Sequence, residues 1–516
     1  MPEYLSPAVY VEEVSSGSKP IESVGTSTGA FVGLAERGPI DKAELITSWT
    51  QYQEIFGGII ADGLLPWAVF HFFNEGGTKC WVVRTCTHTE NVPDARKADP
   101  ITLYDSDGNP SMLVEPKTPG TWAKKYRVYI SNGTNNLPND PQKLKFKLSV
   151  QKEITRNNVP IWVDVEVFDN LEMDSVEDRV NKESIYIKIE VDGWNDGTVV
   201  GSGKRPKNSG PDSVAVFANG DDGNSRVLQV SDLIGDESSR TGLHAFDVVD
   251  DINIVAIPDG EGRIEIMSAG MTYCENRGDC FFIADSMEEQ TPTQILETKL
   301  LNYSSSFGAL YYPWISVNDQ LDPRGGTRLI PPSGSIAGII SRTDVARGVH
   351  KAPAGISEGR VRGARDLEKV LSKGEHDLLN NPGINVIRQF PGAGIVVWGA
   401  RTVAVDAEWK YINVRRLFLM VEESIYKGTQ WVVFEPNDPT LWAKVKRNIT
   451  AFLTNVWRDG ALFGSTPDEA FFVKVDAENN PPSVRDAGRL IIEVGIAPVK
   501  PAEFVIIRIQ QKVLEA

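Results

Sequence analysis

The hydrophobic periodicity of this chain changes twice along its length, and that change restricts the folds open to it more than any other feature. From residue 25 to about 93, and again from about 211 to 385, short apolar runs alternate with stretches of helical spacing. Between them, from about 94 to 210, apolar residues recur at every second position in runs separated by Pro, Gly, Asn and Asp. Alternating strands and helices predict a mostly parallel sheet covered on both faces, and period-two runs predict an all-β unit. We therefore expect a three-layer α/β core with an inserted all-β domain.

Several elements of this core can be placed from their patterns. Glycine after the last apolar turn marks a helix end, and a short, mostly apolar run marks a buried strand. The expected strands lie at 30–34, 80–84, 252–257, 280–284 and 309–312, and the expected helices lie at 49–56, 64–73, 263–275 and 293–303.

The part of the chain from 386 to 502 has a different character, because its helices and strands segregate rather than alternate. The patterns predict helices at 408–426, closed by Gly428, and at 439–458, and strands at 431–435, 470–475 and 490–496. We interpret this part as a separate α+β domain. Its charge also differs: the whole chain has a net charge of −17, but residues 386–516 carry 16 Lys and Arg against 15 Asp and Glu. Such asymmetry indicates two surfaces with different neighbours.

Both ends of the chain read as extended arms. Residues 1–24 contain three prolines, a Ser/Gly cluster and one short alternating piece, Val9, Val11 and Val14. Residues 503–516 contain a strand at 503–509, with Phe504, Ile506 and Arg508 on alternate positions, and it follows two prolines. An isolated strand is unstable unless it pairs, and a neighbouring subunit's sheet edge is one place for it to pair. Pairing within its own chain is the alternative. Two arms per subunit, if both are exchanged, generate an open helical polymer.

The helix at 439–458 carries a basic stripe. At 100° per residue, Lys444, Arg447 and Arg458 lie within about 60° of each other, away from an apolar stripe on the same helix. The stripe is either a solvated face or a docking surface for an acidic partner.

The residues give little support to catalysis. Ser27 lies in a Gly-x-Ser-x-Gly pattern, but an arm precedes it and a strand follows it, whereas a nucleophile elbow needs a strand before and a helix after. Asp285 ends a buried strand, where ligands of α/β sheets gather, but it is more simply a loop or helix-capping residue. The five histidines and four cysteines are scattered without the spacing of a triad or a metal site. We expect no catalytic residue, cofactor or metal.

Composition excludes other classes. The acidic balance disfavours nucleic acid as a partner, no apolar stretch approaches the length of a membrane span, and the first residues lack the features of a secretory signal. Four cysteines are too few for a disulfide scaffold. We therefore expect a chain that is made in a cytoplasm and stays there at first.

Long strings along the chain resemble the contractile tail sheath proteins of myophages, phage-tail-like bacteriocins and extracellular contractile injection systems. They include "FVGLAERGP" at 31–39, "FFNEGGTKCWVVR" at 72–84, "TGLHAFDVVDDINIVAIP" at 241–258, "LYYPWI" at 310–315, "PPSGSIAGIISRTDVARGVHKAPAG" at 331–355, "WGARTV" at 398–403, "YINVRRL" at 411–417, "QWVVFEPND" at 430–438 and "APVKPAEF" at 497–504. The insertion at 94–210 is the least typical part.

This resemblance implies a structural subunit that stacks as hexameric rings around an inner tube and contracts to drive that tube through a target envelope. It also implies arms woven into neighbouring subunits, a C-terminal domain facing the tube, and baseplate and terminal cap proteins as partners. Whether sister sheath proteins share the lattice stays open. Two alternative functions for the chain also stay open: an α/β hydrolase using Ser27 or Asp285, and a surface protein that binds glycans through the β insertion. By the same resemblance, the particle assembles in the host or producer cell and belongs to a phage tail or a related injection particle, with release from the cell as a further option.

Overall fold

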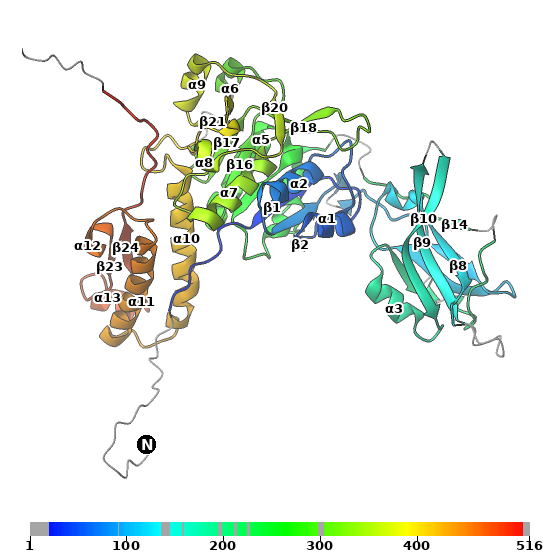
Figure 1. The fold of residues 1–516 in the computed structure, drawn as a ribbon. Helices are drawn as coiled ribbons and strands as arrows, with labels where there is room; N and C mark the ends of the chain where they lie inside the picture. Colours follow the sequence, from blue (N-terminus) through cyan, green and yellow to red (C-terminus); the bar gives the residue numbers. More distant parts are fainter. Residues whose placement is uncertain are drawn as a thin grey trace, which may run out of the picture. The chain divides into compact units, whose positions relative to one another are not determined.

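The computed structural model describes residues 20–90, 92–135, 145–156, 159–194, 199–210, 214–223, 228–297 and 304–508 (Figure 1). Val9, Val11 and Val14 lie outside these residues. The chain divides into two compact units. The core unit comprises residues 27–342 and 353–410, and the C-terminal unit comprises residues 343–352 and everything from 411 on, together with the residues before 27.

The core unit is built on a sheet of eight strands in the order β2-β3-β1-β15-β16-β17-β21-β22. Six central strands are parallel, and β2 and β22 are antiparallel edges. The bounds are β1 (Gly29–Gly33), β2 (Glu44–Ile46), β3 (Cys80–Arg84), β15 (Ile254–Ala256), β16 (Phe281–Asp285), β17 (Gly308–Tyr312), β21 (Ile384–Phe390) and β22 (Gly394–Val397). The expected mostly parallel sheet is thus present.

Helices cover both faces of this sheet. They are α1 (Trp49–Phe56), α2 (Leu65–Glu75), α4 (Val230–Ile234), α5 (Ile264–Arg277), α6 (Pro292–Glu297), α7 (Ser333–Arg347), α8 (Gly355–Glu358) and α9 (Lys373–Asn380). On β1, Ala30 and Val32 share a buried cluster with Met271 of α5, whereas Phe31 packs against Phe72 of α2 with ring centroids 5.4 Å apart. Because neighbouring strand residues face opposite sides, α5 and α2 lie on opposite faces. The core is a three-layer α/β structure.

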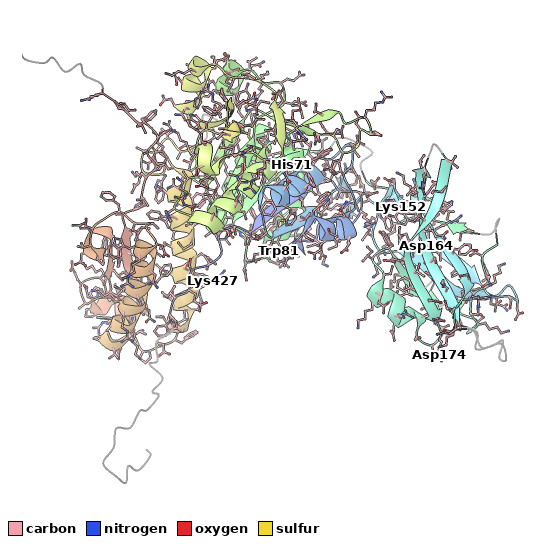
Figure 2. The ribbon with its side chains drawn as sticks, viewed as in Figure 1. His71, Trp81, Lys152, Asp164, Asp174 and Lys427 are labelled. Atoms are coloured by element: carbon pink, nitrogen blue, oxygen red, sulfur yellow. The ribbon has the colours of Figure 1, made fainter. Side chains whose placement is uncertain are left out.

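Helix α2 also buries an ionisable side chain, His71, which is labelled in Figure 2. Only 3% of His71 is exposed, and burial lowers its pKa to about 4. The imidazole is therefore neutral in the folded protein at neutral pH.

The core unit also contains a short three-stranded sheet in the order β19-β18-β20. Its strands are β18 (Ile315–Asn318), β19 (Thr327–Ile330) and β20 (Ala364–Leu367).

The insertion has its own sheets and its own hydrophobic core. Its strands are β4 (His88–Thr89), β5 (Val92–Pro93), β6 (Ile101–Tyr104), β7 (Pro110–Pro116), β8 (Tyr126–Asn132), β9 (Phe146–Arg156), β10 (Val159–Leu171), β11 (Ile187–Glu190), β12 (Asp192–Trp194), β13 (Val199–Val200) and β14 (Ala215–Val216). The expectation of an all-β unit needs two corrections. Helix α3 (Val176–Glu183) lies within it, because Val176 and Val180 reach the buried core at helical spacing. The insertion also continues past residue 210, since β14 pairs with β8.

The C-terminal unit contains α10 (Ile412–Thr429), α11 (Pro439–Arg458), α12 (Pro467–Ala470), α13 (Pro482–Asp486) and the antiparallel pair β23 (Phe471–Lys474) and β24 (Glu493–Ile496). We expected this α+β part to begin at 386. In the structure β21 and β22 extend the large sheet, so residues 386–410 belong to the core unit.

Two local expectations in this unit were wrong, and a third stays a prediction. Residues 431–435 form no strand: a 3-10 helix, Gln430–Val432, and a turn connect α10 to α11, and Val433 and Phe434 are exposed rather than paired. Helix α10 continues through Gly428, where a side chain would come within 2.6 Å of Ile21, so packing rather than helix termination requires this glycine. Residues 503–508 pair with no strand of their own chain, residue 509 lies outside the described residues, and pairing with another subunit stays a prediction.

Candidate functional site

Helix α11 is the most strongly defined element of the C-terminal unit. The Asp438 side chain accepts a hydrogen bond from the Leu441 amide, and Pro439 occupies the first turn, so the sequence fixes where the helix begins. The expected apolar stripe is buried against α10: Leu441, Val445, Ile449, Phe452 and Val456 share a cluster with Leu417, Met420 and Val421. This packing sets which side of α11 faces away from the unit's core.

The basic stripe of α11 is solvent-exposed. Lys444, Arg447 and Arg458 are all exposed, and within the described part of the chain no ion pair involves any of them. Lys446 is exposed too, but at 100° per residue it projects on the other side of the apolar stripe. Three uncompensated cations on one side of a rigid helix can attract an acidic surface.

The N-terminal segment is fixed along α10 from residue 21 to residue 26. Ile21 packs against Gly428, near the end of the helix. The Val24 amide donates to Ser424 Oγ at 3.0 Å, and the Ser23 hydroxyl lies 3.1 Å from Met420 Sδ. The segment therefore runs antiparallel to α10, and its first described residues lie beside the C-terminal end of that helix.

A buried ion pair holds the inner end of this segment. Arg416 forms two charge-assisted bonds with Asp344, at 2.9 and 2.6 Å, and their side chains are 3% and 4% exposed. Thr26 joins them twice: its hydroxyl donates to Asp344 at 2.6 Å, and its carbonyl accepts from Arg416 at 2.7 Å. Bidentate arginine–carboxylate bonding of this kind is both strong and directional.

The C-terminal segment docks at the other end of α10. Asn413 Nδ2 donates to the Val499 carbonyl at 3.2 Å, and the Tyr411 hydroxyl donates to Glu503 Oε2 at 3.2 Å. Beyond Glu503 the chain leaves the unit: Phe504, Val505, Ile506 and Ile507 are 71–79% exposed. Arg508 is exposed as well.

The two terminal segments therefore depart from opposite ends of one helix, as Figure 1 shows. Helix α10 has 18 residues, so at 1.5 Å per residue the departure points are about 27 Å apart. One subunit with this geometry can reach neighbours in two directions.

The sheet of the C-terminal unit is the β23–β24 pair. Its register runs from Phe471 opposite Ile496 to Lys474 opposite Glu493, and within the described residues no third strand joins it. Phe472 on β23 is 59% exposed. Two-stranded sheets are only marginally stable in water, and their free edges are templates for further strands.

Comparison with known proteins decides the family. The phage tail sheath protein central domain matches residues 241–403, and the phage tail sheath C-terminal domain matches residues 404–512. The two matches are adjacent and together cover more than half of the 516 residues. The chain belongs to the phage tail sheath family.

Individual sheath proteins give the same result. The tail sheath protein of Vibrio phage KVP40 is 31% identical over 210 residues, which is 40% of this chain and 30% of that protein. The tail sheath protein of Burkholderia phage BcepMu is 29% identical over 211 residues, 39% of this chain and 42% of that protein. The matched segment thus spans only about a third of the length of the first of these relatives.

Solved structures resemble this sheath chain over nearly its whole length. The PVC sheath complex of an extracellular contractile injection system, in its contracted state, has a TM-score of 0.59 with 22% identity and covers 99% of both chains. The sheath tail protein of Listeria innocua has a TM-score of 0.60 with 12% identity, covering 94% of this chain and 96% of that one. At these identities the likeness establishes the fold.

Asp285 has a structural role in this sheath fold. It ends β16, and its Oδ1 accepts the Ser333 amide, the first of α7, at 2.8 Å. Burial raises the pKa of Asp285 to about 7. The interpretation as a helix-capping residue is therefore correct, and Ser27 lies on neither of the elements that Asp285 joins.

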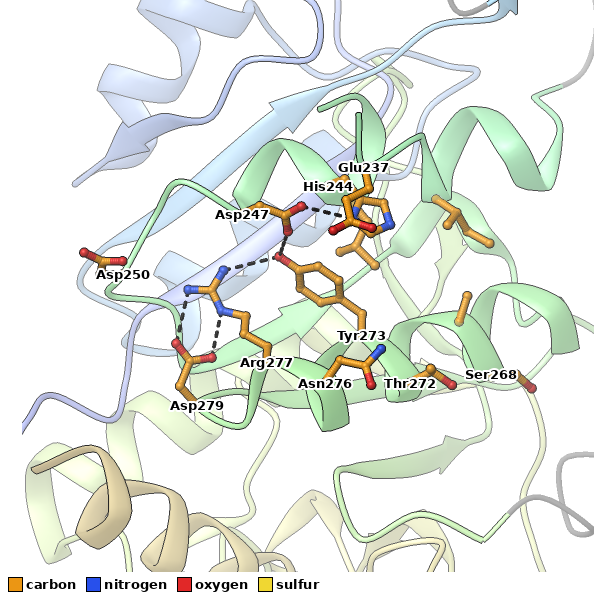
Figure 3. Close-up of a pocket in the computed structure, with 13 residues that line it drawn as sticks. Glu237, His244, Asp247, Asp250, Ser268, Thr272, Tyr273, Asn276, Arg277 and Asp279 are labelled. Carbon is orange, nitrogen blue, oxygen red and sulfur yellow. Dashed lines mark hydrogen bonds and ion pairs between the residues drawn. The ribbon is translucent and has the colours of Figure 1, made fainter. Parts of the chain in front are cut away.

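A cavity of about 640 Å³ lies between α5 and the 3-10 helix Gly242–Phe246 (Figure 3). Asp247 accepts a hydrogen bond from the Tyr273 hydroxyl at 2.9 Å and lies 3.1 Å from His244 Nδ1. Arg277 binds Asp279 at 2.7 Å and the carbonyl of Phe246 at 2.8 Å. These bonds attach α5 to the neighbouring loop.

Within the described residues, no group of three or more metal-ligating side chains occurs, and no helix is long and apolar enough to cross a membrane.

Proposed function

We propose that this chain is the structural subunit of a contractile sheath, stacking as hexameric rings around an inner tube and contracting to drive that tube through a target envelope. The observation that carries the proposal is the departure of the two terminal segments from opposite ends of α10, in a unit whose sheet has only two strands within the described residues. The relatives are named as tail sheath proteins, which favours this function over the hydrolase and glycan-binding alternatives.

The arms would hold the lattice together while the subunits move. If a terminal segment of one copy adds to the β23–β24 sheet of another, four to six backbone hydrogen bonds form, at roughly 1 kcal/mol net each. Such a link tolerates movement of the bodies, because Phe504–Ile507 makes few contacts with its own unit. Many small differences in subunit contact, summed over the lattice, would drive contraction from an extended, metastable form without a nucleotide.

The remaining partners follow from the same proposal. The basic stripe of α11, Lys444, Arg447 and Arg458, would face an acidic tube surface. Baseplate and terminal cap proteins would contact the ends of the stack, and the lattice would assemble in the cytoplasm of the producing cell. The subunit would act as a structural protein and not as an enzyme, with no nucleic acid contact and no membrane insertion of its own.

Truncation tests the arms directly. A chain lacking residues 1–19, or one lacking residues 504–516, keeps the contacts of Ile21, Val24 and Glu503 with α10. Each truncated chain is expected to stay folded by circular dichroism but to form no long sheaths in negative-stain images. Normal long sheaths from either chain would refute the exchange of that arm.

A pair of point variants separates pairing from mere length. Ile506→Pro removes the amide hydrogen that a strand needs, whereas Ile506→Thr keeps both the amide and a β-branched side chain. We expect short or absent sheaths from the proline variant only. Equal assembly of the two variants would mean that residue 506 forms no intermolecular strand.

A further inference from the structure

Within the core unit, the chain passes from the large sheet into the insertion after β3 and returns from it at α4, and these two crossings form the root of the insertion. The outgoing crossing contains Thr85 to His88, and the returning one contains Gly223 and the segment from Gln229 to Asp232. They are bonded together: the Thr87 amide donates to the Gly223 carbonyl at 3.2 Å, and the Thr85 hydroxyl donates to the Asp232 carbonyl at 2.7 Å.

The His88 side chain lies at the centre of this root. Its Nε2 is 2.6 Å from Asp41 Oδ2, and its Nδ1 is 3.7 Å from Asp232 Oδ1. The side chains of His88, Asp41 and Asp232 are only 9%, 7% and 2% exposed. A buried imidazole thus lies between two buried carboxylates that come from different parts of the chain.

Acceptors face both nitrogens of this ring. Asp41 Oδ2 lies 2.6 Å from Nε2, Asp232 Oδ1 lies 3.7 Å from Nδ1, and a backbone hydrogen bond with Cys86 also raises the pKa of the ring. A neutral imidazole carries one N–H, so its other nitrogen would direct a lone pair at an acceptor. The doubly protonated ring satisfies both sides and also offsets one of the two negative charges. The pKa of His88 is accordingly raised, chiefly by the hydrogen bond to Asp41, although burial acts in the opposite direction.

The two carboxylates extend the connection to further segments. Asp41 Oδ1 accepts the Gly242 amide at 2.9 Å. Asp232 accepts the His88 amide at 3.1 Å and the Gln229 amide at 2.7 Å. The charged groups that act on the ring are therefore Asp41 from the β1–β2 loop and Asp232 from α4. Arg84 is directed at Asp222, 3.5 Å away.

We propose that His88 is a proton-dependent lock on the root of the insertion: as imidazolium it joins the β1–β2 loop, the outgoing crossing and α4, and loss of its second proton releases this junction. The proposal stands on the geometry of the core unit and does not depend on the sheath function. Because the folded-state pKa of His88 lies above the ordinary value of about 6.5, the stabilisation is complete below that value and is lost as pH rises through the folded-state pKa.

Hydrogen–deuterium exchange of the full-length chain tests the lock. Exchange is measured between pH 6 and pH 9 and corrected for the intrinsic effect of pH, using peptides that cover 85–90, 228–235 and 240–244. We expect protection at these peptides to fall at least tenfold over this range, relative to peptides from β16 in the same sample. Constant protection across the range would overturn the proposal.

Variants assign the effect to the ring. His88→Gln donates one hydrogen bond at every pH, so the root should be weakly protected throughout and its pH dependence should vanish. His350→Gln is the control, because His350 lies in the C-terminal unit, outside all the monitored peptides, and should leave the wild-type profile intact. If His88→Gln does not fold, Asp41→Asn provides the second test: loss of that charge should move the midpoint of the protection change to lower pH. A wild-type profile in either root variant would contradict the lock.

Discussion

Arg416 and Asp344 form a buried bidentate ion pair, with bonds of 2.9 and 2.6 Å, and Thr26 binds both partners. Asp344 lies some 70 residues before Arg416 in the sequence, and Thr26 lies 390 residues before it. This single cluster therefore fixes the inner end of the N-terminal arm to α10. The arm begins from a rigid point, so a load on it would be transmitted to the helix rather than absorbed by a loose tether.

Removal of one partner of this pair should destabilise the C-terminal unit strongly. Arg416→Ala leaves the Asp344 carboxylate buried without its countercharge, a situation that typically costs 3–5 kcal/mol. Urea unfolding monitored by tryptophan fluorescence would measure the change. The control is Lys427→Ala, which breaks the exposed Lys427–Glu423 pair and should cost less than about 1 kcal/mol. Equal effects of the two substitutions would contradict the anchoring role of Arg416.

The basic stripe on α11 should govern binding to an acidic tube and not folding. Lys444→Glu combined with Arg447→Glu reverses two exposed charges, so we expect weaker co-sedimentation with the tube protein, a smaller dependence on salt and an unchanged unfolding midpoint. Lys446→Glu, on another side of the same helix, is the matched control and should bind nearly as well as the wild type. If only the Lys446→Glu control lost binding, the tube would contact the side of α11 that carries Lys446, which would contradict the proposed role of the basic stripe.

Acid should destabilise the core unit through His71. The unfolded chain binds a proton there below about pH 6.5, whereas burial lowers the pKa in the folded protein to about 4. Stability should therefore fall as pH drops from about 6.5 to 4, by up to roughly 3 kcal/mol. His71→Leu removes the titration, and denaturant unfolding across this range should show a flatter profile. Parallel profiles for the two proteins would exclude His71 as the cause.

Asp285 should act in the opposite direction. Its folded-state pKa of about 7 lies above the ordinary value, so the folded protein binds this proton more tightly than the unfolded chain does. The free energy of unfolding should therefore decline as pH rises from about 4 to 7. Asp285→Asn keeps an oxygen for the Ser333 amide without the buried charge and should be more stable than the wild type at pH 8 by roughly 2 kcal/mol. Asp285→Ala lacks the acceptor and should be less stable than the asparagine variant by about 1 kcal/mol. An asparagine variant less stable than the wild type at pH 8 would contradict this interpretation.

Elements with strong local signals could be predicted to the residue. Helix α11 begins at a capping aspartate followed by proline, and α1 ends at a glycine with a positive φ. The positions of the basic stripe on α11 could be predicted from the spacing of 100° per residue along this helix. By contrast, α7 has apolar and polar residues spread evenly around it and contains two glycines within its buried length. Added side chains at Gly334 and Gly338 would come within about 2.5 Å of the α2 backbone, so close helix packing explains a composition that local propensity disfavours.

The long-range parts of the candidate site could not be predicted. The contacts that fix the N-terminal segment join residues about 400 positions apart, such as Val24 and Ser424, and no periodicity encodes them. The β-branched and aromatic run after Trp431 favours a strand locally, yet no partner strand is available between α10 and α11, so it forms a turn. Strand propensity is realised only where an edge is free to pair.

A high-resolution image of the assembled sheath in its extended state is the most direct test of the account. We expect residues 504–508 of one copy to lie as a strand against the β23–β24 sheet of another copy, and residues 1–19 to reach a second neighbour. Both termini folded back onto their own protomer, in an intact and contractile sheath, would contradict it.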